Sequence, residues 1–266
     1  MLSLKRFLLT TTMVFIAFTS QLLRAQCIDT TQSPTPRIVL ILDDMGNSLS
    51  LGEQALALPG AINYAFLPHS PNSIELANKA HILGKEILLH APMSNLSSKP
   101  LGPGALTPIM DRHEFLDTLR KNLISVPHVS GLNNHMGSLL TQLREPMTWL
   151  AAELKLQNLY FVDSRTSPLT VAELIAKNYY LPTLKRDVFL DNVRDRRAIS
   201  KQFEKLLQLA KSQGVAVAIG HPHPETIAFL NKALPTLAAR GFQLSLVSNA
   251  LPFKNLAQSE YACAKT

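Results

Sequence analysis

The sequence predicts an α/β protein in which parallel strands and covering helices form an incomplete (β/α) barrel of about seven strands. Short apolar, β-branched runs alternate with amphipathic segments of helical periodicity along most of the 266 residues. The apolar runs are continuous, which is typical of strands that are buried on both faces of a parallel sheet. So many short units in one chain of this length favour a barrel over an open sheet.

The N-terminus has the pattern of a secretory signal, which we expect to cover residues 1–25. Lys5 and Arg6 form a short basic region, and an apolar run follows from Phe7 to Phe18. This run is shorter than the roughly 20 apolar residues that a membrane-spanning helix needs. Ala25 is a small residue at which a signal peptidase could cut. The sequence therefore predicts export to the periplasm or another extracytoplasmic space, and the alternative is an uncleaved signal anchor.

The remaining chain divides into a flexible lead-in (26–36), a barrel (37–250) and a C-terminal tail (251–266). The expected strands are Arg37–Leu42, Ile62–Leu67, Glu86–Leu89, Val129–Asn133, Leu159–Val162, Tyr180–Leu184, Val215–Ile219 and Leu244–Val247. The expected helices are Leu49–Leu58, Ser73–Leu83, Asp111–Ile124, Glu145–Leu156, Val171–Lys177, Arg196–Ser212 and Glu225–Ala239. Ser94–Pro108 is rich in Ser, Gly and Pro, and we expect an active-site loop there.

Composition and missing motifs exclude several classes of function. The net charge of +7 is not gathered into a basic stripe with interleaved aromatics, so no nucleic-acid partner is expected. After signal cleavage no segment could form a stable membrane span. The absence of HExxH, GxSxG and phosphate-loop motifs removes zincin, serine-hydrolase and P-loop functions. Cys27 and Cys263 could form a disulfide in an exported protein, or remain two unpaired thiols.

Reactive side chains recur where the expected strands end. In parallel α/β folds these ends meet at one rim, where substrates bind. Two imidazoles and one carboxylate suit a divalent metal, most simply Zn²⁺ with open positions. Such a metal lowers the pKa of bound water to about 7, and a neighbouring carboxylate and histidine could move the protons. The strand-end sequences are Asp43-Asp44, His90, Asn133-Asn134-His135, Asp163-Ser164-Arg165, Asp187 to Asn192 and His221-Pro222-His223.

Structural roles compete with these functional ones. An aspartate pair often caps a helix, although Ser48 and Ser50 could cap the following helix instead. Asp163 and Arg165 could simply pair with each other. One of the two histidines in His221-Pro-His-Pro could only support the other. Four further histidines are expected to be structural, namely His69, His81, His113 and His128.

Six motifs in this order resemble the divergent polysaccharide deacetylase family. They are LDDMG, LLHAPM, LNNHMGS, FVDSRT, RDVFLDN and IGHPHPET, and the resemblance extends from about Arg37 to Asn249. It implies a deacetylase-like fold, a distorted or incomplete (β/α) barrel related to carbohydrate esterases that remove N-acetyl groups from glycans.

The resemblance also implies roles for residues of this chain. Asp43 corresponds to the catalytic base and Asp44 to a metal ligand. His90 matches the first histidine of the relatives' His-x-x-x-His motif, but Ser94 stands at the second position. We expect His135, from the neighbouring strand, to replace that ligand. His221 resembles the general acid, with His223 as its substitute.

The sequence is compatible with three functions. The first is metal-dependent removal of an acyl group, expected to be N-acetyl, from an envelope glycan. In it Asn134, Asp163, Arg165, Asp187, Asp191 and His223 would bind sugar hydroxyls or orient the catalytic side chains. The second is a non-catalytic envelope protein that binds a glycan or a protein partner on a deacetylase-like barrel. The third is a metallohydrolase acting on peptides or small amides. The sequence leaves the oligomeric state open.

Overall fold

The structure, a computed structural model, describes residues 35–251, and these residues belong to one compact unit. Its strands form one curled parallel sheet, with β9 paired to β1 and the others in the order β6-β5-β4-β3-β2-β1-β8-β7. Because β6 and β7 are free edges, the sheet is a half-barrel, which confirms the expected incomplete barrel. The strands are β1 (Arg37–Met45), β2 (Asn63–Phe66), β3 (Glu86–Met93), β4 (Val129–Met136), β5 (Tyr160–Asp163), β6 (Thr183–Lys185), β7 (Val188–Phe189), β8 (Val215–Gly220) and β9 (Gln243–Ser245).

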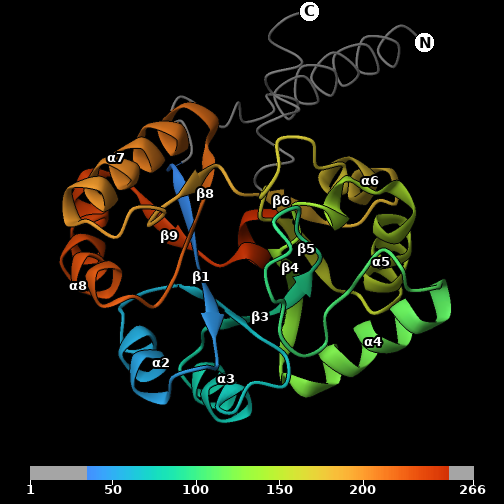
Figure 1. Ribbon diagram of the computed structural model, residues 1–266. Helices are drawn as coiled ribbons and strands as arrows, with labels where there is room; N and C mark the ends of the chain where they lie inside the picture. Colours follow the sequence, from blue (N-terminus) through green and yellow to red (C-terminus); the bar gives the residue numbers. More distant parts are fainter. Residues whose placement is uncertain (1–34, 252–266) are drawn as a thin grey trace, which may run out of the picture. The chain divides into compact units, whose positions relative to one another are not determined.

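Helices cover the convex side of this sheet (Figure 1). Ser48 caps α2 by accepting a hydrogen bond from the Leu51 amide, so the preceding aspartate pair is free of that role, as the sequence indicated. Asp111 and Asp195 cap α4 and α7 in the same way. The helices are α2 (Leu49–Leu56), α3 (Ser73–Ile82), α4 (Arg112–Ser125), α5 (Arg144–Leu156), α6 (Ala172–Asn178), α7 (Arg196–Gln213) and α8 (Pro224–Ala233).

Several details differ from the sequence prediction. Strands β1, β3 and β4 extend past their expected ends to Met45, Met93 and Met136. The helix expected to reach Ala239 ends at Ala233, and two short 3₁₀ turns follow. Pro235 explains the break, because proline lacks the amide hydrogen that a continuing helix needs. The two-residue strand β7 was not expected, because it is too short to show a pattern. The strand expected at Tyr180–Leu184 begins only at Thr183, after Pro182.

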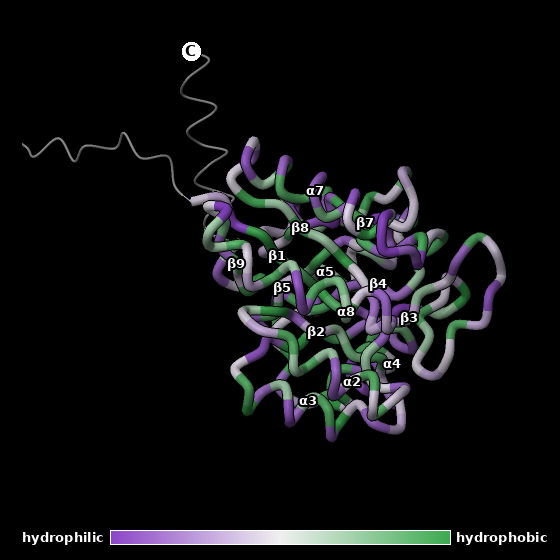
Figure 2. Tube along the Cα trace, turned by 90° about the vertical axis from the view of Figure 1, so that its left-hand side faces the viewer, coloured by the Kyte–Doolittle hydropathy of each residue, from purple (hydrophilic) through white to green (hydrophobic). Residues whose placement is uncertain are grey.

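Alternate residues of each strand face two different cores. One core lies between the sheet and the helices and includes Leu40 and Leu42 of β1. The other fills the concave side of the sheet and includes Val39 and Ile41. Figure 2 shows the hydrophobic residues gathered along the strands and more hydrophilic ones near the ends of β3 and β4. Burial of both faces explains why the strands read as continuous apolar runs.

The last described residues, around Val247 to Ala250, cover the concave side of the sheet at the amino-terminal ends of its strands. Val247 and Ala250 are fully buried in the inner core. The Val247 amide donates to Asn63 Oδ1 at 2.9 Å, and Ser248 donates to Glu86 through its amide and its hydroxyl. Asn63 and Glu86 begin strands β2 and β3, so this contact fixes the amino-terminal end of the barrel.

Several sequence predictions lie outside the described residues. These are the signal peptide, Cys27, Cys263 and most of the C-terminal tail. Within residues 35–251, no helix is both long and apolar enough to span a bilayer.

Candidate metal centre and active site

The alternation of strand residues decides which polar side chains meet at the mouth of the half-barrel. Asp43 follows Val39 and Ile41 on the concave face of β1, and His90 follows Leu88 on β3. Asn133 lies directly across from His90 in the sheet register. His135 continues the same face on β4, and His221 directly follows β8. Residues that are distant in sequence therefore lie above one inner core.

Asp44 joins this group because β1 is irregular at its end. The register with β2 shifts between Leu42 and Met45, and Asp44 has a φ of 57°, in the left-handed region. Regular alternation would send two consecutive aspartates to opposite faces, whereas this bulge lets both face the mouth. Gly46 follows with a φ of 113°, and a Cβ there would lie 2.0 Å from Ser73 Oγ, so the turn requires glycine.

Asp44, His90 and His135 form a cluster that could hold a metal ion. Asp44 Oδ1 lies 2.9 Å from His135 Nδ1 and 3.3 Å from His90 Nε2, and the two imidazole nitrogens are 3.1 Å apart. The donor atoms all lie within 4.8 Å of one another. Asp44 Oδ1 is buried and accepts no hydrogen bond. A buried oxygen without a donor costs free energy, and a cation at this point would satisfy it. The residues therefore fit a divalent metal such as Zn²⁺.

Asn133 connects a metal ligand to the candidate base. Its amide nitrogen donates to Asp43 Oδ1 at 2.8 Å, so its amide oxygen faces His90 Nδ1, also at 2.8 Å. His90 must then donate from Nδ1, which leaves Nε2, 3.3 Å from Asp44 Oδ1, as the nitrogen that can bind a metal. This arrangement fixes the tautomer that a metal ligand needs.

Burial and charge act on the two aspartates in different ways. Asp43 is fully enclosed, and burial raises its pKa although His90, His221 and Asn133 oppose the shift. Burial would also raise the pKa of Asp44, but the close imidazoles of His135 and His90 outweigh burial and hold that pKa far below its usual range. Asp44 is thus the more anionic of the pair and suits a ligand, whereas Asp43 is the more basic and suits proton transfer.

His221 forms a second polar unit on the other side of the mouth. Its Nδ1 donates to Asp191 Oδ1 at 2.9 Å, while Asp191 Oδ2 accepts from the His221 amide and from Thr226 Oγ1. Burial alone would lower the pKa of His221, but Asp191 and the other carboxylates raise it. His221 Nε2 points toward Asp44 Oδ2 at 3.8 Å. The ring of His223 stacks on that of His221, and burial lowers the pKa of His223.

The structure gives other candidate residues supporting contacts. Asn134 faces the convex side, where it accepts from the Ser164 amide and donates to the Met136 carbonyl. Asp163 accepts from the Arg165 backbone amide and from Thr170 Oγ1, so within residues 35–251 it makes no ion pair with the Arg165 guanidinium. These side chains hold the loops of the mouth in place.

Asp187 lies below the mouth, because its carboxylate accepts from the Val217 amide in the middle of β8. Sequence reasoning missed its neighbour Arg186, which shares the inward face with Leu184 of β6. Arg186 donates to the carbonyls of Ser164 and Arg165, at 2.5 and 2.8 Å. The sequence prediction also left out Asn133 as a residue that orients Asp43 and His90, although two-residue alternation places Asn133 on the same face as His135.

The four histidines expected to be structural lie outside the cluster. His69 Nε2 lies 3.1 Å from Asn122 Oδ1. His81 and His128 stack with ring centroids 3.9 Å apart, and His113 is exposed on α4. None of them belongs to a metal-ligand cluster in the described part of the chain.

A cleft of about 260 Å³ opens beside the cluster and is bounded by the expected active-site loop. Ser94, which stands where relatives would have a second histidine, fixes the base of this loop. Its amide donates to the Leu106 carbonyl, and its own carbonyl accepts from the Leu139 and Leu140 amides. The cleft is lined by Asp44, Asn47, Leu67, Pro68, Ser70, Pro92, Pro100, Leu101, Gly102, Pro103 and His135.

Comparisons with known proteins show the family of the chain. A family model described as divergent polysaccharide deacetylase matches residues 40–251. The uncharacterized protein YibQ of Escherichia coli is 39% identical over 201 residues, which cover 76% of this chain and 63% of that protein. The matched part of this chain thus spans less than two thirds of that relative.

Solved structures support the fold. An uncharacterized protein, ATU2773 from Agrobacterium tumefaciens, superposes with a TM-score of 0.79 at 21% identity, covering 83% of this chain and 91% of that one. A variant of the peptidoglycan deacetylase PdaC from Bacillus subtilis superposes with a TM-score of 0.51 at 12% identity, covering 87% and 97%. At these identities the likeness concerns the half-barrel architecture.

Proposed function

The chain belongs to the divergent polysaccharide deacetylase family, and from this premise we propose that it is a metal-dependent hydrolase that removes an acyl group, N-acetyl first, from an envelope glycan. The observation that carries the proposal is the buried, unbonded Oδ1 of Asp44 between two imidazoles, with a basic carboxylate and a protonatable imidazole beside it. We further propose that the protein is exported and that the metal is Zn²⁺.

Asp44, His90 and His135 would hold the metal, which supplies a Lewis acid and an acidified water when bound. Asp43 takes the proton of the attacking water, because burial raises its pKa and Asn133 holds its carboxylate in place. His221 donates a proton from Nε2 to the leaving nitrogen, since Asp191 anchors its Nδ1 and raises its pKa. Both groups lie beside the proposed ligands, since His221 Nε2 is 3.8 Å from Asp44 Oδ2 and Asp43 Oδ2 is 3.6 Å from His90 Nε2.

Metal analysis tests the proposal directly. We expect about one equivalent of a divalent metal in protein purified without chelators, and its loss in His135→Ala. The metal-loaded protein should release acetate from N-acetylated glycan oligomers, and Asp43→Asn should abolish release while keeping the metal. Metal-free wild-type protein that cannot be loaded would contradict this mechanism and favour a glycan-binding role. Release from acetylated peptides but not from glycans would instead favour the small-amide alternative.

A further inference from the structure

The end of the half-barrel opposite the mouth carries exposed apolar side chains at four successive helix ends. Helices in parallel βα units run back across the sheet, so each ends near the start of the next strand. The side chains of Ile82, Ile124, Leu156 and Tyr180 are 83%, 83%, 79% and 85% exposed. We call this surface the amino-terminal rim; it comprises Ile82, Leu83, Ile124, Leu156, Tyr179 and Tyr180.

These helix ends form one surface. Figure 1 shows α3, α4, α5 and α6 following one another around the same side of the sheet. The contacts between neighbours are the stacked rings of His81 and His128, the ion pair of Arg120 with Glu153 at 2.8 Å, and the bond from Lys155 Nζ to the Tyr179 carbonyl at 2.8 Å. Lys155 also lies 5.3 Å above the Tyr180 ring.

The charge of the rim is positive. Lys121 of α4 and Lys155 of α5 lie near its apolar side chains and have no carboxylate partner within residues 35–251, whereas Lys85 is half-buried and donates to the Leu58 and Gly60 carbonyls. The acidic residues at this end are already engaged. Glu86 and Glu153 are buried and bonded, to Ser248 and Arg120 respectively, and Glu53 is paired with Lys79.

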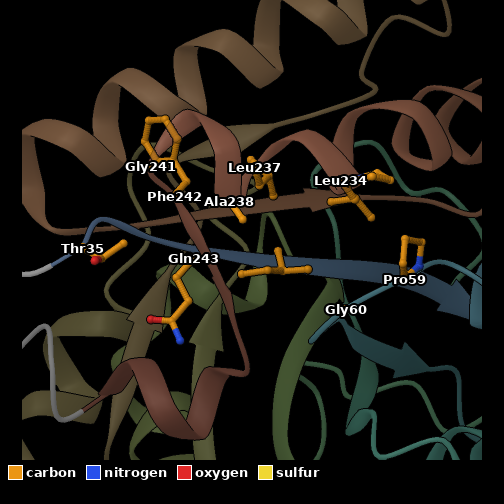
Figure 3. Close-up of a pocket in the computed structure, with 11 residues that line it drawn as sticks. Thr35, Pro59, Gly60, Leu234, Leu237, Ala238, Gly241, Phe242 and Gln243 are labelled. Carbon is orange, nitrogen blue, oxygen red and sulfur yellow. The ribbon is translucent and has the colours of Figure 1, made fainter.

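An apolar groove of about 570 Å³ lies at the same end of the sheet (Figure 3). It is lined by Pro59, Leu234, Leu237 and Phe242, and Thr35, the first described residue, contributes to it. The chain therefore enters the half-barrel at this end, after a segment that contains the apolar run from Phe7 to Phe18.

We propose that the amino-terminal rim docks on an anionic lipid surface. Separate large apolar side chains with lysines between them and tyrosines at the margin are the pattern of an interfacial membrane contact. Each exposed lysine near such a surface adds attraction to anionic headgroups. Because β1 has nine residues, docking holds the mouth about 30 Å from the lipid and facing away from it. This inference goes beyond the proposed hydrolase and does not depend on it.

Vesicle sedimentation tests the docking. The protein used starts at Gln26, which retains the whole compact unit from Thr35 and omits the apolar run that would bind lipid by itself. It is mixed with vesicles of phosphatidylglycerol and phosphatidylcholine in equal parts, or with phosphatidylcholine alone. The rim variant is Ile82→Ser/Ile124→Ser/Leu156→Ser. The control, Leu96→Ser/Ile109→Ser/Leu169→Ser, removes three other exposed apolar side chains that lie outside the rim, and thermal melts establish that both variants fold.

We expect the wild type and the control to bind the anionic vesicles at least about tenfold more tightly than the rim variant, since burying a large apolar side chain is worth a factor of this order. High salt should weaken this binding. Equal binding by all three proteins, or no binding by the wild type, would overturn the proposal. It would also be overturned if light scattering showed that the wild type and the control are dimers in solution and the rim variant is a monomer, because the rim would then be a protein interface.

Discussion

Asn133 orients two functional side chains of this centre, Asp43 and His90. A single amide orients the carboxylate of Asp43 and fixes the tautomer of His90, while its neighbour Asn134 faces the other side and holds a loop. The two residues share a chemistry and differ only in the face of β4 that they occupy.

This difference gives a matched pair of variants. We expect Asn133→Ala to weaken metal binding about 10- to 100-fold, because a ligand loses the partner that orients it. Asn134→Ala should leave metal binding nearly unchanged but lower the free energy of unfolding by about 1–3 kcal/mol, because the buried Ser164 amide loses its hydrogen-bond acceptor. A chromogenic chelator competition and a urea titration measure the two quantities. Equal effects of both variants on metal binding would refute the division of roles.

Asp191 and Asp163 form a second comparison. Both are buried carboxylates, but Asp191 positions His221 whereas Asp163 accepts from the Arg165 and Glu173 amides and the Thr170 hydroxyl. We expect Asp191→Asn to lower kcat at least about 100-fold with little change in KM, since a general acid loses its orientation. Asp163→Asn should chiefly reduce stability. Steady-state kinetics on an acetylated oligomer with thermal melts separates these outcomes, and a pure KM effect for Asp191→Asn would count against the acid role of His221.

At the scale of elements, ion pairs fix neighbouring helices to each other. Arg120 of α4 donates two hydrogen bonds to Glu153 of α5, at 2.8 Å each. These bonds lower the pKa of Glu153, against burial, which would raise it. A lowered folded-state pKa means that the stabilisation is complete above the ordinary value of 4.5 and is lost as the pH falls through the folded-state pKa.

Glu153→Gln should therefore lower the free energy of unfolding by about 0.5–1 kcal/mol at neutral pH, since Arg120 is half exposed and water screens the pair. The difference from the wild type should shrink as the pH falls below 4.5. Urea titrations across this pH range measure it. Glu204→Gln is the control, because its pair with Arg240 is more exposed and should contribute less. A difference that stays constant with pH would exclude the ion pair as its cause.

At the scale of the whole molecule, an open half-barrel must cover its concave side, and the segment around Val247 and Ala250 does so. We expect Val247→Ala to cost about 1–3 kcal/mol of unfolding free energy, because it leaves a cavity in the inner core. Leu251→Ala, at a half-buried position of the same segment, should cost less. Thermal or urea unfolding compares the two variants. A larger loss of unfolding free energy in Leu251→Ala would show that the inner core does not depend on Val247.

Metal binding should also stabilise the fold as a whole. A ligand that binds only the folded protein at 100 times its Kd adds about 2.7 kcal/mol. We expect Zn²⁺ to raise Tm in the wild type and to have no effect on Asp44→Ala, as measured by differential scanning calorimetry before and after chelation. A rise of Tm in both proteins would indicate binding elsewhere.

The sequence by itself determined the parallel α/β half-barrel, because continuous apolar strands and amphipathic helices can bury their surfaces in few other ways. It also indicated that Asp43, His90, His135 and His221 come to one rim, because they lie at or just after the carboxyl ends of strands that run in the same direction. The resemblance also implied that Asp44 is a metal ligand, but only the tertiary structure shows how it faces the mouth beside Asp43, because that depends on a bulge and a left-handed backbone.

Only the structure likewise distinguished Asn133 from Asn134 and placed Arg186 above the inner core, since these roles depend on which face of a strand meets which core. Local patterns fix the type of each element. The face that an element turns toward the site is settled by register and packing with residues far away in the chain.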